Sequence, residues 1–177
     1  MTSAVPRAIE TAAILATGTG LVPVVNAGWN ELRPGDLALL PPARLRAVIM
    51  DAYRNAADPG ACFFGGEGFG DFARRVGDVL DRLLAVADWS TAAVVTHDPV
   101  LRFLIARCLG LGLAGMRFFE QEPGCINVIE FKKSADGTGD PLIRLLNGAP
   151  GDLVRLAARG PALDRFYQRY SGAPAAR

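Results

Sequence analysis

Apolar residues recur every three or four positions in several segments of the chain, a spacing that predicts amphipathic helices. The clearest of these segments covers residues 71–87. One side of it carries the apolar residues Phe72, Val76, Val79, Leu80, Leu83 and Leu84. Three more helices are predicted, at residues 7–16, 41–57 and 99–111, each with a proline at or just before its start, where proline suits a first turn.

Other apolar residues stand in short continuous runs, which is typical of buried strands. Such runs occupy residues 21–26, 91–98, 125–133 and 141–147, and the last two flank the turn "SADGTGD". Helices alternate with these runs, so the predicted class is α/β, with a mostly parallel sheet flanked by helices.

The length of 177 residues suits one domain with a sizeable core. We expect a single domain over residues 1–170, whose final part, 150–170, forms two short helices. Residues 171–177, "SGAPAAR", are expected to form a flexible tail.

Composition narrows the class of protein further. Half of the residues are hydrophobic, 21% are charged and the formal net charge is +1, which fits a globular protein without a strong overall field. We therefore expect neither nucleic acid nor a membrane as a partner, and no apolar run approaches the roughly 20 residues of a span. The three cysteines are widely spaced without a CxxC pair, which favours a reducing, cytoplasmic location.

Three polar residues stand where chemistry is plausible. Arg7 lies about one turn into a predicted helix, where a guanidinium can grip an anion beside free N–H groups. His97, the only histidine, follows a predicted strand at the sheet edge where ligands bind. Glu31 stands in the loop "GWNELRPGD" and could donate a proton. A solvated arginine, a histidine that closes a strand and a surface glutamate are the structural alternatives.

The segments "SAVPRAIETAAIL", "WNELRPGD", "GGEGFGDFARRVGDVLDRL" and "TAAVVTHDPVLRFLIARCLGL", in this order, resemble the histidine phosphatase superfamily, with its phosphoglycerate mutase-like fold. The resemblance implies a phosphohistidine mechanism that needs no metal or cofactor. It implies that Arg7 and His97 hold the phosphate, that Glu31 protonates the leaving oxygen and that Ser3 helps to bind the substrate. The substrate would be a small phosphorylated molecule or phosphate.

Two departures from the family pattern change the expectation. The Arg-His-Gly segment that carries the nucleophilic histidine, at the end of the first strand, is not in the sequence and is expected just before residue 1. The first, central strand of the sheet is therefore expected to be missing. In addition, Asp98 follows His97 where the family usually has glycine, and it places negative charge beside the expected phosphate.

Three hypotheses follow. The first is an N-terminally truncated phosphomonoester phosphatase, a hydrolase that is inactive as it stands. The second is a non-catalytic pseudophosphatase that binds a phosphorylated ligand or a partner protein. In the third, His97 itself is the nucleophile, although its family position is unsuited to in-line attack. The gap left by the missing strand would be closed by its neighbours or covered by a second copy, which makes a homodimer possible.

Overall fold

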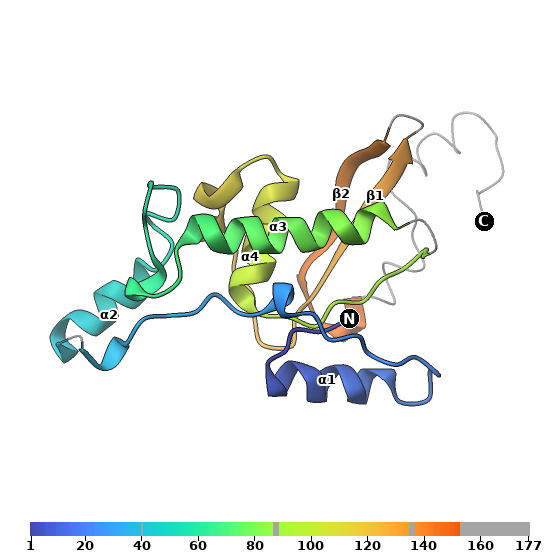
Figure 1. Cartoon of the computed structure of the whole chain (residues 1–177), viewed down its shortest axis with the longest axis horizontal. Helices are drawn as coiled ribbons and strands as arrows, with labels where there is room; N and C mark the ends of the chain where they lie inside the picture. The colour runs from blue at the N-terminus through green and yellow to red at the C-terminus, as the bar shows by residue number, and fades with distance from the viewer. Residues whose placement is uncertain (40, 87–88, 135–136, 153–177) are drawn as a thin grey trace. The chain divides into compact units, whose positions relative to one another are not determined.

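The computed structural model describes residues 1–39, 41–86, 89–134 and 137–152, which fall into two compact units (Figure 1). The first unit is Met1–Gln121, and the second begins at Glu122. The single domain over 1–170 stays a prediction. The expected tail, and nearly all of the expected helices within 150–170, lie outside the described residues.

The first unit contains the four predicted helices. They are α1 (Pro6–Ala16), α2 (Pro42–Met50), α3 (Phe69–Ala85) and α4 (Asp98–Cys108). The prediction for α2 was too long, because the chain turns repeatedly over residues 51–57. Short 3₁₀ helices lie between and after them, namely η1 (Ala27–Trp29), η2 (Leu37–Leu39), η3 (Phe63–Gly65) and η4 (Gly112–Phe118).

The core of this unit forms between the apolar sides of α3 and α4. Phe72 and Phe103 meet edge to face with ring centroids 5.7 Å apart. Val76 of α3 and Val100 of α4 are completely buried. Burying each such side chain contributes about 1.5–3 kcal/mol. The contact between these side chains therefore holds α4 against α3.

No single described helix is long and apolar enough to cross a membrane. The pair α4 and η4, bent by 119° at its break, passes the same test together, by length and composition only.

Extended chain near the N-terminus brings three distant segments together. Thr2 is completely buried and forms parallel bridges with Val25 on one side and Val95 on the other. The predicted strands 21–26 and 91–98 are therefore extended, yet each makes a single bridge to the residues that the structure describes. The expectation that 91–98 is a buried strand was wrong, because among the described residues its backbone pairs with residues 1–3 alone, and Ala93 is exposed.

The second unit contains an antiparallel pair, β1 (Ile126–Ser134) and β2 (Gly137–Gly148). Ile129 faces Ile143 in the register, and Glu130 pairs with Arg144 at 2.5 Å. Both strands were predicted, although β2 begins before the expected Pro141. Helices and strands are present, but the described strands do not confirm a mostly parallel sheet, and the missing first strand stays a prediction.

Candidate phosphate site

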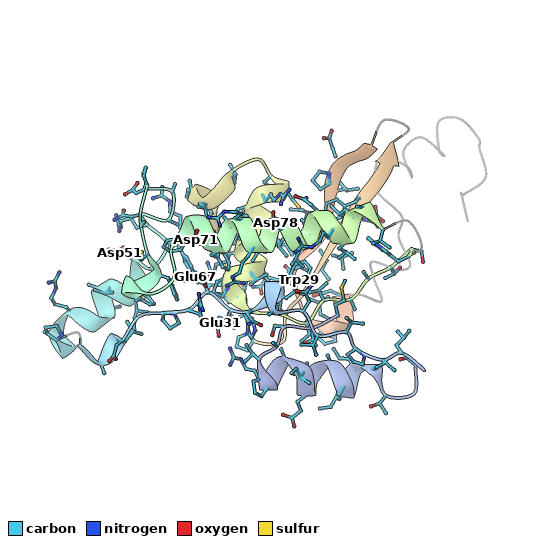
Figure 2. The ribbon with its side chains drawn as sticks, viewed as in Figure 1. Trp29, Glu31, Asp51, Glu67, Asp71 and Asp78 are labelled. Atoms are coloured by element: carbon cyan, nitrogen blue, oxygen red, sulfur yellow. The ribbon has the colours of Figure 1, made fainter. Side chains whose placement is uncertain are left out.

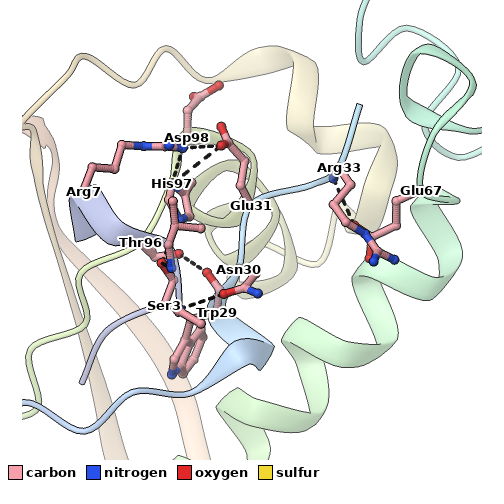
Figure 3. A network of polar contacts seen from close by, with 12 residues as sticks. Ser3, Arg7, Trp29, Asn30, Glu31, Arg33, Glu67, Thr96, His97 and Asp98 are labelled. Atoms are coloured by element: carbon pink, nitrogen blue, oxygen red, sulfur yellow. Dashed lines mark hydrogen bonds and ion pairs between the residues drawn. The ribbon is translucent and has the colours of Figure 1, made fainter. Parts of the chain in front are cut away.

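The first unit brings His97 together with residues from the start of the chain (Figure 3). His97 is the residue before α4, and only 6% of it is exposed. Its Nε2 lies 2.8 Å from Ser3 Oγ, and its Nδ1 lies 3.1 Å from Arg7 Nη2. Both partners are 90 or more positions away, so the site is a product of the tertiary fold.

These contacts assign the protonation state of His97. An arginine has only donors, so Nδ1 must accept from Arg7, and the ring proton sits on Nε2, which donates to Ser3 Oγ. Burial lowers the pKa of His97, and the nearby positive charge of Arg7 lowers it further, against the opposing effect of Glu31. The imidazole is therefore neutral at pH 7.

Arg7 links the imidazole to the acidic loop. The same Nη2 that faces His97 also donates to Glu31 Oε2, which lies 3.9 Å from His97 Nδ1. The side chains of Arg7 and Glu31 are 62% and 42% exposed, so the site opens to solvent. The predicted residues Arg7, Glu31 and His97 thus lie together, while their catalytic and binding roles stay predictions.

Ser3 lies on the closed side of the site. It is completely buried, and its hydroxyl also accepts the backbone N–H of Val5 at 3.3 Å. Its closest described partner is the imidazole, so the hydroxyl can hold the ring of His97 in place. Direct contact of Ser3 with a substrate stays a prediction.

The loop that carries Glu31 is anchored by its own neighbours. Trp29 and Leu32 are buried beneath it, and the backbone oxygen of Trp29 accepts a hydrogen bond from Thr96 Oγ1 at 2.7 Å. Gly28 fits against α3 so closely that a Cβ there would lie 2.1 Å from a methyl carbon of Val79. Buried residues on either side of Glu31 therefore leave its carboxylate facing outward.

Arg75 of α3 holds the same loop from the other side. It donates to the backbone oxygens of Gly28, Asn30 and Glu31 at 3.1, 2.7 and 3.0 Å. It also makes two hydrogen bonds to the Glu67 carboxylate, at 2.8 and 2.9 Å. Figure 2 shows Glu31 and Glu67 toward the N-terminal end of α3 and Trp29 farther along the helix.

Glu67 supports the same loop from a buried position. Its side chain is only 4% exposed and pairs with Arg75. Burial pushes the pKa of Glu67 up, whereas hydrogen bonds from Arg75 and the Arg33 backbone, together with their charges, outweigh this and lower it. A charged arginine eight positions after the glutamate was the available signal.

Asp98, next to the imidazole, was expected to repel phosphate. Its Oδ1 instead accepts from Arg102 Nε at 2.6 Å, and its Oδ2 accepts from the Tyr53 hydroxyl at 3.2 Å. Arg102, one turn along α4, thus offsets the negative charge. Sequence reasoning missed Tyr53, which reaches the site from the turns after α2.

A separate hollow of about 460 Å³ lies along α2 and the segment that follows it. Its lining contains none of Ser3, Arg7, Glu31 and His97. Among the described residues, no three His, Cys, Asp or Glu side chains group as a metal site would require. The expectation of a mechanism without metal or cofactor stays a prediction.

An arginine, a carboxylate and a neutral imidazole converge at a solvent-open position just before helix α4, an arrangement able to bind an anion such as phosphate. The chain belongs to the histidine phosphatase superfamily (branch 1), whose family model matches residues 1–137. It is 42% identical over 65 residues to the adenosylcobalamin/alpha-ribazole phosphatase of Salmonella typhi, covering 37% of this chain and 32% of that protein. The chain thus aligns with about a third of the length of the curated relatives it matches.

Solved structures resemble the chain over more of its length. The alpha-ribazole phosphatase of Shigella flexneri matches with a TM-score of 0.63 and 26% identity, over 83% of this chain and 71% of that one. A mycobacterial glucosyl-3-phosphoglycerate phosphatase matches with a TM-score of 0.66 and 23% identity, over 84% and 76% of the two chains. At 23% identity, the likeness to the mycobacterial enzyme supports a shared fold alone.

Proposed function

We propose that the first unit binds the phosphate group of a phosphomonoester between Arg7 and His97. The observation that carries the proposal is the convergence of Arg7, Glu31 and His97 at one solvent-open position. Of the three guanidinium nitrogens of Arg7, only Nη2 makes hydrogen bonds within the described part of the chain, so Nε and Nη1 can bind two phosphate oxygens. A bound phosphate competes for Arg7 and releases the Glu31 carboxyl toward the leaving oxygen.

The proposed chemistry is hydrolysis through a phosphohistidine. A histidine nitrogen attacks phosphorus, and the bond to the leaving oxygen breaks while that oxygen takes a proton from Glu31. Water, deprotonated by the same carboxylate, then attacks phosphorus and releases phosphate and the histidine. The named relatives are phosphatases of alpha-ribazole and glucosyl-3-phosphoglycerate compounds, which supports a small phosphomonoester as the substrate.

The presence of a nucleophile distinguishes a phosphatase from a non-catalytic phosphate-binding protein. The 177 residues contain one histidine, and both ring nitrogens of His97 are engaged by Ser3 and Arg7. We therefore assign the nucleophile to the Arg-His-Gly segment that the family resemblance implies. This same observation favours the second candidate, a non-catalytic phosphate-binding protein, for the 177 residues by themselves.

Calorimetric titration with inorganic phosphate tests the site. Arg7→Gln and His97→Gln are each expected to weaken phosphate binding about tenfold or more, because each removes a charged or charge-assisted contact. The control Arg74→Gln removes an equally cationic side chain that pairs with Asp71 on the surface of α3. Equal affinities in the wild type, both site variants and the control would contradict the proposal.

Turnover of p-nitrophenyl phosphate separates the catalytic hypotheses. The 177-residue chain should show no turnover that depends on His97, whereas a chain extended by in-frame upstream codons that encode Arg-His-Gly should hydrolyse the substrate. An in-frame stop codon directly upstream would favour the non-catalytic protein. Turnover by the 177 residues that disappears in His97→Ala would establish His97 as the nucleophile and overturn our assignment.

A further inference from the structure

Asp98 is a carboxylate with unused acceptor capacity beside the phosphate site. It directly follows His97 and opens α4. Its two described contacts, to Arg102 and Tyr53, occupy one position on each oxygen, while a carboxylate offers about four. The side chain is 38% exposed, and Figure 3 shows it pointing to the same side of His97 as the Glu31 carboxylate. A ligand held by Arg7 and His97 can therefore reach it.

The hydroxyl of Tyr53 is held in a fixed place. Its ring stacks on Phe63 with centroids 5.8 Å apart and meets Phe69 edge to face at 6.4 Å. The guanidinium of Arg102 lies 5.1 Å from the ring centre. Burial raises the pKa of Tyr53, and the charges of Asp98 and Glu31 raise it further although Arg102 opposes them, so the hydroxyl stays protonated.

Arg102 makes this acidic position compatible with phosphate. It is 9% exposed and binds the carboxylate of Asp98 through Nε and the backbone oxygens of Met116 and Phe119 through Nη1. The arginine thus offsets the charge of the aspartate while leaving the outer face of the carboxylate open. Arg102 Nη2 also lies 3.7 Å from the exposed carboxylate of Glu120. Asp98 is therefore held in a fixed place as a hydrogen-bond acceptor whose charge the guanidinium offsets in part.

We infer that Asp98 and Tyr53 determine specificity by binding hydroxyl groups on the leaving group of the phosphomonoester, an assignment that rests on the proposed phosphate site. The ligand class is a polyhydroxylated, sugar-like phosphate. Asp98 accepts from one hydroxyl, and the Tyr53 oxygen, whose proton is directed to Asp98, accepts from a neighbouring one.

Charge favours hydroxyl groups over the other polar groups of a leaving group. An ammonium would meet the buried guanidinium of Arg102 behind Asp98, which weakens the attraction of the carboxylate. A carboxylate would meet Asp98 and Glu31 together and would be repelled. A neutral hydroxyl is not repelled by either kind of charge, and it gains a hydrogen bond to a charged acceptor.

Titration with three probes tests the assignment: inorganic phosphate, methyl phosphate and ribose 5-phosphate. The wild-type chain is expected to bind ribose 5-phosphate about tenfold more tightly than methyl phosphate. Tyr53→Phe and Asp98→Asn should each reduce this ratio to about one to three, while Tyr53→Phe leaves methyl phosphate affinity within about threefold. The matched control is Asp81→Asn, which changes an exposed aspartate paired with Arg107 and should keep the full ratio.

The probes separate the two possible failures. If the wild type binds neither inorganic nor methyl phosphate, the proposed function is wrong and this assignment falls with it. If methyl phosphate binds and ribose 5-phosphate has no advantage, or the advantage survives in Tyr53→Phe, only the present assignment is overturned. Tyr53→Phe keeps the ring and its packing, so it remains informative even where Asp98→Asn fails to fold with Arg102 unpaired.

Discussion

At the scale of single residues, His97 is held in one protonation state by its surroundings. A buried imidazole loses the hydration that favours its charged form, and Arg7 approaches Nδ1 with a further positive charge. Ser3 fixes the other nitrogen and hence the ring orientation. The neutral ring is ready to take up a proton when an anion joins Arg7, which suits a group that binds phosphate.

The lowered pKa of His97 predicts how stability changes with pH. Between the folded value and the ordinary value of 6.5, the unfolded chain binds more protons, so the free energy of unfolding rises with pH. The contribution is fully present above about pH 6.5 and is lost as the pH falls. Urea unfolding at pH 7.0 and 5.5 should show this loss, and His97→Gln should reduce it. Both pH values lie above 4.5, the ordinary pKa of a glutamate such as Glu67. An identical loss of stability in both proteins would contradict the prediction.

At the scale of elements, helix α3 positions the loop that carries Glu31. Arg75 gathers three backbone oxygens of that loop, and Glu67 fixes Arg75. Gly28 lets the loop approach Val79 where any side chain would collide. The catalytic carboxyl we propose is therefore placed by a rigid helix, although it stands in irregular chain.

Removing Arg75 should damage this arrangement. Arg75→Gln removes two hydrogen bonds from the buried Glu67 carboxylate and leaves it the backbone N–H and the more distant guanidinium of Arg33, so the free energy of unfolding is expected to fall by about 3 kcal/mol. The neighbouring Arg74→Gln, whose pair with Asp71 is exposed, should change it by less than about 1 kcal/mol. Urea unfolding measures both variants, and similar effects at the two positions would argue against the role of Arg75.

The elements also show what the sequence could predict. Apolar periodicity located α1, α3 and α4 because a helix face is a local property of the chain. Arg7 and His97 stand near the starts of α1 and α4, where local signals suggested a site. Tyr53 carries no such signal, since its partner Asp98 stands 45 positions away in the chain. The strand at 91–98 looked buried because its apolar run says nothing about how many neighbours pair with it.

At the scale of the whole molecule, every described contact of the site falls within the first unit. The hydrogen bonds that support Asp98 extend along the chain to Phe119, whose backbone oxygen accepts from Arg102. The net charge of +1 gives no long-range field, so phosphate affinity must come from these local groups. The second unit contains the antiparallel pair β1 and β2. The homodimer expected from the sequence stays a prediction.

Because the described contacts of the site fall before Glu120, we predict that a cut directly after Glu120, one residue before the first unit ends at Gln121, spares phosphate binding. Glu120 lies in irregular chain with its side chain 77% exposed, so glutamyl endopeptidase should cut there before it cuts at the buried Glu67. The 1–120 fragment keeps Arg7, Glu31 and His97 with their supporting contacts. It should therefore bind inorganic phosphate within about threefold of the intact chain, a difference below 1 kcal/mol.

Mass spectrometry identifies the cut, and calorimetry on the purified fragment measures its affinity. The variant Glu120→Gln should resist this first cleavage and serves as the control for the site of the cut. Loss of phosphate binding by a fragment that remains folded in circular dichroism would mean that residues beyond 120 complete the site. We expect the opposite, because the guanidinium, imidazole and carboxyl proposed to hold the anion are all fixed within the first unit.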